Sequence, residues 1–198
     1  MSNPSGADGC TRCCSKFCGL LFFAGFLVFD FWLIFRPRRI GASVDSASLT
    51  EFALSPSGAL LFNLTADLSL RNPNSRIGVY YDRLDAAAFY SGALLGPADS
   101  PFPEFYQHPK TTTAVSAVFK GRTAGVGAGV SDAFGREKGE GAFRVEITVH
   151  AKLRYKVWFA KVHGFKPKVD CVVKLLPPPP TAVSSAAAFA PTKCSVDY

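Results

Sequence analysis

Two long segments of the chain alternate between apolar and polar residues, which is the pattern of a strand with one buried face. In the first segment, residues 60–71, every second side chain from Leu60 onward is apolar. The second segment, residues 144–159, alternates in the same way from Val145 onward. Both segments are predicted to be half-buried strands of an antiparallel sheet. The second is long for a single strand, so we expect a bulge or a bend within it.

Shorter runs of the same kind cover much of the remaining chain. Clusters rich in Asn, Pro, Ser and Gly separate them and predict turns. About seven strands without a convincing amphipathic helix predict an all-β fold, an antiparallel β-sandwich over residues 40–176. The shorter strand candidates are residues 44–54, 77–81, 84–90, 111–120 and 166–176.

Two segments break the strand pattern. Residues 114–141 form the loosest stretch and contain a glycine-rich segment at 125–129, which lacks the lysine of a phosphate-binding loop and is expected to be mobile. After the last strand candidate, four prolines at 177–180 predict a short polyproline II spacer. Residues 177–198 are therefore expected to form a Pro/Ala-rich C-terminal tail.

An apolar segment, residues 17–35, precedes the predicted strands. As a helix it spans roughly 28 Å, close to the hydrocarbon thickness of a bilayer. A buried core helix and a cleaved signal peptide are the alternatives, but Arg36, Arg38 and Arg39 stand where a cleavage site needs small residues. The segment is predicted to be a transmembrane signal-anchor helix, with Asp30 near enough to one end to reach the interface.

The cysteines before and within the anchor suggest its orientation, because Lys and Arg are balanced on its two sides. Cys13, Cys14 and Cys18 have the juxtamembrane position typical of acylation on the cytosolic side. Their spacing lacks the second, separated pair of a zinc module, which disfavours the alternative of a metal site. Residues 1–16 are therefore expected to form a cytosolic tail.

Features beyond the anchor agree with this orientation. Asn63 stands in the only N-glycosylation sequon of the chain. Cys171 and Cys194 make an even pair, as expected of a disulfide in an oxidising compartment, with two buried free thiols as the alternative. The sequence thus predicts a cytosolic N-terminus and a domain outside the cytosol.

The composition indicates a folded chain, and the scattered histidines argue against catalysis. Apolar residues make up 48% of the chain and charged residues 19%, which excludes a disordered polar chain. His108, His150 and His163 are far apart in the sequence and have no carboxylate or cysteine at a spacing that suits a triad or a metal site. We expect no enzymatic activity, no metal and no cofactor.

One block of the chain runs from Asn72-Pro73-Asn74 to Tyr80-Tyr81-Asp82, and several shorter blocks precede and follow it. In their order along the chain these blocks resemble the plant harpin-induced-like family, relatives of the non-race-specific disease resistance protein, and the block at 72–82 is the most specific of them. The resemblance implies a plasma-membrane protein with one anchor and an extracellular late embryogenesis abundant group 2 domain, a sandwich like fibronectin type III. It also implies a role in immunity and stress responses without enzymatic activity. The other blocks are residues 31–38, 44–49, 105–107, 111–113, 154–157, 166–171 and 194–198.

A basic row on the second long strand is the feature most suited to binding. Lys152, Arg154 and Lys156 project from one side, in line with Trp158, in a chain of net charge +7. Such a row attracts acidic polymers or anionic headgroups, and outside a plant cell the obvious acidic polymer is pectin. A solvated strand face kept charged for solubility is the alternative. Nucleic acid is not expected as a partner, because the anchor places this face outside the cell.

Together these features predict a single-pass plasma-membrane protein that acts by binding in plant defence and stress signalling. The alternative is a stress protectant, or a lipid-binding sandwich, without a specific partner. Membrane and cell-wall components are the expected partners, and a homo-oligomer stays open.

Overall fold

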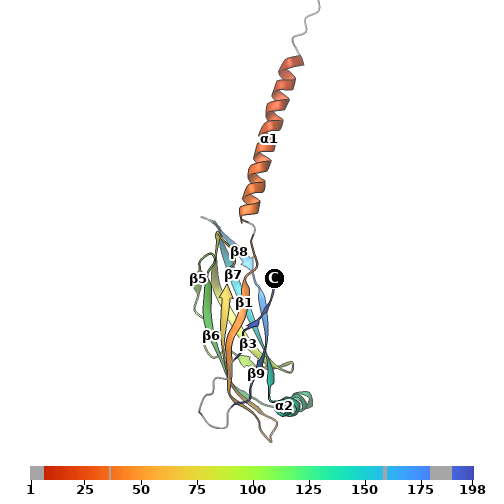
Figure 1. Cartoon of the computed structure of the whole chain (residues 1–198), viewed down its shortest axis with the longest axis vertical. Coiled ribbons are helices and arrows are strands. Elements are labelled where there is room, and N and C mark those ends of the chain that lie inside the picture. The colour runs from red at the N-terminus through yellow and green to blue at the C-terminus, as the bar shows by residue number, and fades with distance from the viewer. Residues whose placement is uncertain (1–6, 36, 158–159, 179–188) are drawn as a thin grey trace, which may run out of the picture. The chain divides into compact units, whose positions relative to one another are not determined.

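The structure, a computed structural model, describes residues 7–35, 37–157, 160–178 and 189–198 of the 198-residue chain. The chain divides into two units, residues 1–37 and 38–198. The first unit contains the helix α1 (Ala7–Phe35), which includes the whole apolar segment 17–35 (Figure 1). Among the residues that the structure describes, no helix has the length and hydropathy of a membrane-crossing segment. The anchor role of this segment stays a prediction.

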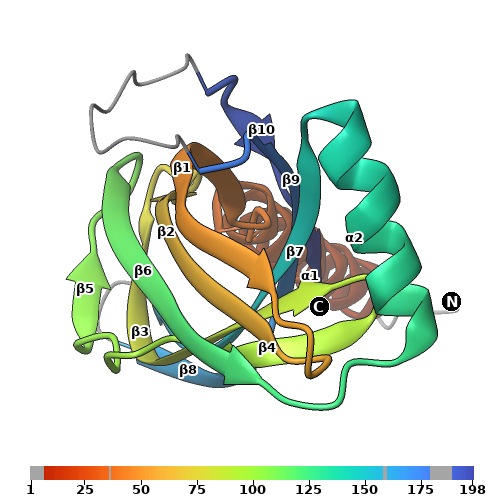
Figure 2. The ribbon, with the colours of Figure 1, turned by 90° about the horizontal axis from the view of Figure 1, so that it is seen from below.

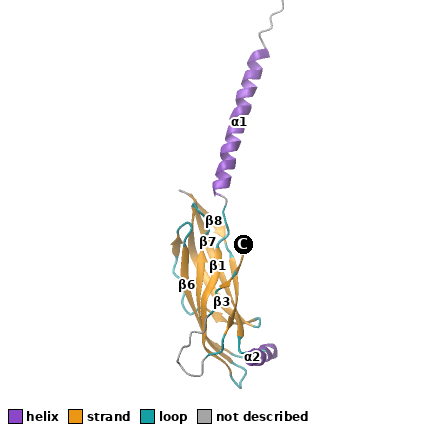
Figure 3. Ribbon diagram, viewed as in Figure 1, coloured by secondary structure: helices purple, strands orange, loops and turns teal. Residues whose placement is uncertain are grey.

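The second unit consists of two antiparallel sheets that pack face to face, as the view along the strands in Figure 2 shows. The smaller sheet has the strand order β10-β1-β2-β6. The larger has the order β11-β9-β7-β3-β4, with β5 beside β3 and β8 beside β7. This arrangement confirms the predicted antiparallel β-sandwich (Figure 3). The strands are β1 (Gly41–Leu54), β2 (Leu60–Arg71), β3 (Ile77–Tyr90), β4 (Ala93–Pro97), β5 (Phe105–Gln107), β6 (Thr112–Thr123), β7 (Phe143–Val157), β8 (Ala160–Phe165), β9 (Lys168–Leu175), β10 (Thr192–Lys193) and β11 (Ser195–Asp197).

The core lies between the inner faces of the sheets. Every second residue of β2 from Leu60 to Leu70 is buried, and so is every second residue of β7 from Phe143 to Tyr155. These are the apolar positions of the two alternating segments, since successive side chains of a strand point to opposite faces. The polar positions of the same strands therefore lie on the outer faces, which makes those faces the surfaces available for binding.

The expected irregularity in the second long segment lies in its partner strands. β7 is continuous from Phe143 to Val157. Opposite it, β3 shifts register between Tyr81 and Arg83, so Asp82 is an extra residue. A bulge of this kind lets two successive residues face the same side of the sheet. Asp82 thereby joins Arg83 on the outer face, while Tyr81 and Leu84 are buried.

The glycine-rich segment leads into a helix, α2 (Ala128–Glu140), where the sequence predicted a mobile loop. Val130, Ala133 and Phe134 are its buried residues, and they follow the i, i+3, i+4 spacing of one helix face. The Phe134 ring stacks on Phe143, with ring centroids 5.3 Å apart. Gly141 ends the helix in the left-handed conformation, at φ 73°. Packing on the core thus stabilises a helix that its own sequence only weakly favours.

The C-terminal segment adds a strand to each sheet, although the sequence analysis treated residues 177–198 as a tail. β10 pairs with β1 in the smaller sheet, and β11 pairs with β9 in the larger. Between them, Cys194 forms a disulfide with Cys171 of β9. The Tyr198 hydroxyl accepts a hydrogen bond from the Ile40 N–H at 2.8 Å. The last residues therefore tie both sheets to the start of the sandwich.

The two ends of the sandwich contain different side chains. At the α2 end, aromatic rings pack together, with Phe52 at the centre of the group. At the opposite end, where β1 begins, Asn72, Asn74 and Gln107 are buried and hydrogen-bonded. We call these the aromatic end and the amide end. The Asn72-Pro73-Asn74 motif is thus part of the amide end, where Asn72 and Asn74 are buried.

Candidate functional site

A row of side chains crosses the outer face of the larger sheet near the amide end. In the strand register, Arg154 of β7 lies opposite His163 of β8 on one side and Tyr80 of β3 on the other. Tyr80 in turn lies opposite Tyr106 of β5. Adjacent strands are about 4.8 Å apart, so these side chains are neighbours although they come from four separate segments.

The rings of this row are surrounded by cations. The Tyr80 and Tyr106 ring centroids are 4.5 Å apart. The Arg154 guanidinium carbon lies 5.4 Å from the Tyr80 centroid, and the Lys161 Nζ lies 5.2 Å from it. The Lys156 Nζ lies 5.6 Å from the Tyr106 centroid. Cations within about 6 Å of a ring face are attracted by its quadrupole, so the tyrosines hold three cations close together. We call these five residues the cation–aromatic face.

One of the three cations is paired within the protein. Asp82, the extra residue of the β3 bulge, accepts hydrogen bonds from Arg154 Nε at 2.6 and 2.8 Å. This hydrogen bonding raises the pKa of Arg154. The bulge thus provides a carboxylate that fixes the position of Arg154 at the centre of the row.

The two lysines have no such partner. Lys156 and Lys161 lie directly opposite each other on β7 and β8. None of the ion pairs in the described part of the chain includes either lysine. Like charges directly opposite on neighbouring strands repel each other. An anion bound between them would remove this repulsion, so the cation–aromatic face is suited to an acidic ligand.

The buried Gln107 holds Tyr106 in place. Its amide donates to the carbonyl of Leu70 at 2.7 Å, and its side-chain oxygen accepts from the Tyr81 hydroxyl at 3.1 Å. Gly78 lies under the Tyr106 hydroxyl, and any side chain at this position would clash with it. The hydrogen bonds of Gln107 thus hold the short strand β5, and the contact with Gly78 holds the ring of Tyr106.

The structure groups only part of the predicted acidic-ligand face. Arg154 and Lys156 belong to the cation–aromatic face. Lys152 is exposed one pair further along β7, opposite Arg83, whose guanidinium is paired with Asp85 at 2.7 Å. Trp158 lies outside the described residues.

The sequence analysis missed Tyr80, Tyr106 and Lys161 as members of the site. Tyr80 and Tyr106 stood in blocks that carried the family resemblance, but nothing in those blocks indicated that β3 and β5 pair. Lys161 follows β7 closely, so a hairpin prediction after the basic row was the one signal that could have found it.

The outer face of the smaller sheet contains a contrasting set of groups. Asp67 accepts hydrogen bonds from Ser116 Oγ and Ser46 Oγ, both at 2.5 Å. These two hydrogen bonds, Ser116 first, lower the pKa of Asp67. Asn63 is half-buried on the same face, between Glu51 and Lys120 on the neighbouring strands. Around Asp67 the short polar groups satisfy one another, which leaves less charge for a ligand on this part of the face.

The other predicted sites are not members of the cation–aromatic face. Cys171 and Cys194 form the disulfide described above. Cys18 is an exposed free thiol on α1, whereas the side chains of Cys13 and Cys14 lie outside the described part of the structure. Within that part, no three His, Cys, Asp or Glu side chains gather in a way that would hold a metal ion.

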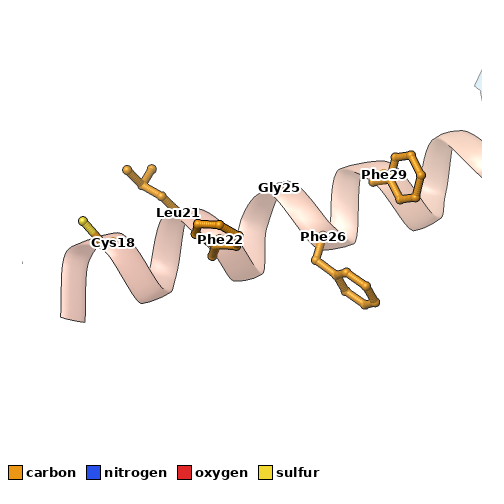
Figure 4. Close-up of a pocket in the computed structure, with 6 residues that line it drawn as sticks. All are labelled: Cys18, Leu21, Phe22, Gly25, Phe26 and Phe29. Carbon is orange, nitrogen blue, oxygen red and sulfur yellow. The ribbon is translucent and has the colours of Figure 1, made fainter. Parts of the chain in front are cut away.

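A hollow on α1 does not have the character of a ligand site. All of its residues come from one helix, and Figure 4 shows the rings pointing in different directions. A ligand pocket needs several polar groups that converge on one point, and here Cys18 provides the only polar atom of a side chain. The lining residues are Cys18, Leu21, Phe22, Gly25, Phe26 and Phe29.

Comparison with known proteins gives consistent matches over most of the chain. The model of the family LEA_2, late embryogenesis abundant protein, matches residues 67–171. NDR1/HIN1-like protein 3 of Arabidopsis thaliana is 36% identical over 168 residues, covering 84% of this chain and 71% of that protein. NDR1/HIN1-like protein 10 of the same plant is 36% identical over 182 residues, covering 90% of this chain and 79% of that protein.

A solved structure gives a weaker match. A protein from Archaeoglobus fulgidus is 12% identical, with a TM-score of 0.33 over 67% of this chain and 96% of that chain. This similarity is too low to support an inference.

Proposed function

Because the chain belongs to the LEA_2 family of late embryogenesis abundant proteins, we propose that it is a membrane-anchored binding protein of plant stress and defence responses. In this proposal it acts by binding, without catalysis, and its cation–aromatic face recognises an acidic ligand. The match to NDR1/HIN1-like proteins of a plant supports the biological setting.

The observation that carries the proposal is the pair of opposed lysines beside two tyrosine rings. Lys156 and Lys161 repel each other in the free protein, and a carboxylate between them would accept hydrogen bonds from both. Tyr80 and Tyr106 limit the movement of the cations, which lowers the entropy lost when a ligand binds. The face is therefore preorganised for an anion.

Membrane anchoring is the second part of the proposal. Residues 17–35 are apolar in the sequence, and nineteen residues in a helix would span roughly 28 Å, close to the hydrocarbon thickness of a bilayer. With Cys13, Cys14 and Cys18 on the cytosolic side, the sandwich and the Cys171–Cys194 disulfide would lie outside the cell at the plasma membrane. The accessible acidic polymers there are cell-wall polysaccharides rich in uronic acids, and we propose these as the ligand class.

Binding to immobilised polygalacturonate tests the face. The full chain in a nonionic detergent is compared with the double variant Lys156→Glu/Lys161→Glu. We expect a loss of affinity of tenfold or more, on the order of 0.7 kcal/mol or more per charge contact. Lys120→Glu/Lys174→Glu is the matched control, because both lysines are exposed on strands and outside the face. Equal losses in the two variants would mean that net charge alone drives binding, as in a protectant without a specific partner.

Protease protection of microsomes tests the topology, with glycosidase treatment to detect a glycan on Asn63. We expect a protected, glycosylated sandwich. A protease-sensitive, unglycosylated sandwich would place it in the cytosol and remove cell-wall polysaccharides as the ligand.

A further inference from the structure

A shallow hollow at the amide end of the smaller sheet contains a second group of cations. Arg39, Arg71 and Lys193 line it, and they come from the start of the sandwich, from β2 and from β10. The hydroxyl side chains that line it with them are Ser43, Ser69 and Thr112. Guanidinium and ammonium groups together form a set of donors for a phosphate group, whereas the Ser43 and Ser69 hydroxyls already donate their hydrogens to Asp45.

The backbone shapes this hollow, because a glycine leaves space in it and the C-terminal segment is held along one side of it. Gly41 pairs with Arg71 and has no side chain to fill the space above the sheet. Lys193 lies opposite Ser43 in the β10–β1 pairing, and the next residue, Cys194, donates its N–H to the Ala42 carbonyl at 3.0 Å. The disulfide from Cys194 to Cys171 anchors the same segment. A lysine on the C-terminal segment is thereby kept beside β1.

The three cations have no carboxylate partner in the described part of the chain, where the ion pairs involve other residues. Asp45 is the carboxylate that lines the hollow, and its oxygens already accept hydrogen bonds from Ser43 Oγ and Ser69 Oγ. The Arg39 guanidinium carbon lies 5.8 Å from the centroid of the Tyr198 ring. Hydrogen bonds from hydroxyl groups leave the charge of Asp45 in place, but the three cations outnumber this one carboxylate, so the hollow keeps a positive net charge.

We propose that this hollow binds the phosphate of an anionic phospholipid headgroup. The inference rests on the proposed anchor, because Arg39 follows Phe35, the last residue of α1, by only four residues. Four residues span at most about 14 Å, so a membrane anchor would keep Arg39 near the headgroups. Arg39 and Arg71 provide planar donors that fit phosphate oxygens, and Lys193 adds a point charge.

Hydrogen exchange of the full chain in nanodiscs tests the proposal. Nanodiscs of phosphatidylcholine alone are compared with nanodiscs that also contain phosphatidic acid. We expect amide hydrogen exchange at residues 41–45 and 192–194 to slow by roughly tenfold. This holds when the concentration of phosphatidic acid that the protein can reach is about ten times the Kd of the hollow for this lipid. The double variant Arg71→Gln/Lys193→Gln should lose this protection. Lys120→Gln/Lys174→Gln, which removes the same charge elsewhere, should keep it, and unchanged exchange in β7 shows that each variant is folded.

Two further samples identify the source of the anion. Inorganic phosphate added to phosphatidylcholine nanodiscs should protect the segment less than phosphatidic acid does, and equal protection would overturn the lipid as the ligand. Protection by polygalacturonate that disappears in Arg71→Gln/Lys193→Gln would also overturn it.

Failure of this inference is distinguishable from failure of the proposed function. A chain that does not enter nanodiscs contradicts the proposed anchor. A chain that enters them and shows no protection from phosphatidic acid contradicts the headgroup site alone.

Discussion

The aromatic end and the amide end close the same gap between the two sheets with opposite chemistry. At the aromatic end, the Phe52 ring contacts Phe143, Tyr90 and Phe134, with centroids 4.6, 5.1 and 5.7 Å away. At the amide end, Asn72 and Gln107 donate to main-chain carbonyls of neighbouring segments. Burial of rings is non-directional, whereas each amide hydrogen bond fixes a donor and an acceptor in distance and angle.

Both candidate binding sites lie at the amide end, where hydrogen bonds fix the course of the backbone. Tyr106 of the cation–aromatic face precedes Gln107, and Arg39 of the hollow follows Arg38, whose N–H donates to Asn74 Oδ1 at 2.6 Å. Both sites thus lie beside a buried amide that determines where the backbone runs. In the proposed function, the amide end would position the binding groups accurately, and the aromatic end would contribute mainly to the stability of the sandwich.

The largest expected effect is at the aromatic end. Phe52→Ala removes the central ring of the group and leaves a cavity between the sheets, so the free energy of unfolding should fall by about 3–5 kcal/mol. Chemical denaturation of the full chain in detergent measures this loss. Polygalacturonate binding under folding conditions should stay within about twofold of the parent chain.

Phe89→Ala is the matched control, because Phe89 is a half-exposed residue of β3. Its loss of stability should be much smaller. If Phe52→Ala instead reduced ligand binding as strongly as the face variants, the division of roles between the two ends would be wrong.

The same contrast explains which parts of the fold were predictable. The strands β2 and β7 could be predicted from the sequence, because their inner residues must be apolar and their outer residues face solvent. Helix α2 did not, because Gly129, Gly135 and Gly139 weaken its own helical preference. Its stability depends on contacts of Phe134 with Phe143 of β7 and with Phe52, which is distant in the sequence. The β10 and β11 strands are too short to show a period.

The candidate site was predictable only along one strand. Arg154 and Lys156 share a face of β7, which two-residue periodicity reveals. Tyr80, Tyr106 and Lys161 reach that site through the register between strands, which depends on turns and on the bulge at Asp82. The hollow depends in the same way on the pairing of Lys193 with Ser43.

An intermediate effect is expected from Gln107→Leu at the amide end. This substitution removes the donor to the Leu70 carbonyl and the acceptor of the Tyr81 hydroxyl, whereas the Thr111 carbonyl keeps its hydrogen bond from the Asn72 N–H. Since each unsatisfied buried group costs about 1–3 kcal/mol, the free energy of unfolding should fall by about 2–4 kcal/mol. Polygalacturonate affinity should also fall about fivefold or more, because β5 no longer holds Tyr106 in place.

Thr113→Val provides the comparison, because it removes one of the acceptors of Gln107 and leaves the others. It should destabilise by about 1 kcal/mol and leave binding intact. A Gln107→Leu chain that is destabilised but binds normally would show that the amide end contributes stability alone.

The smallest effect at neutral pH concerns Tyr155, which shares a hydrogen bond of 3.3 Å with Tyr198 near the amide end. Burial, and then this hydrogen bond, raise the pKa of Tyr155 in the folded chain. Folding therefore favours the neutral hydroxyl, and its contribution to the free energy of unfolding is fully present below the unfolded pKa of about 10. As the pH rises above about 10, the unfolded chain ionises first and stability is lost.

Tyr155→Phe should accordingly cost about 1 kcal/mol at pH 7 and flatten the decline above pH 10 by up to about 1.4 kcal/mol per pH unit. Urea unfolding at neutral and alkaline pH measures both quantities. At the aromatic end, Tyr90 also has a raised pKa, from burial and from its hydrogen bond to Glu137. Because that acceptor is charged, Tyr90→Phe should cost more at pH 7, about 1.5–3 kcal/mol. If Tyr155→Phe and Tyr90→Phe lowered the free energy of unfolding equally, the two ends would not differ in how strongly they hold a buried hydroxyl.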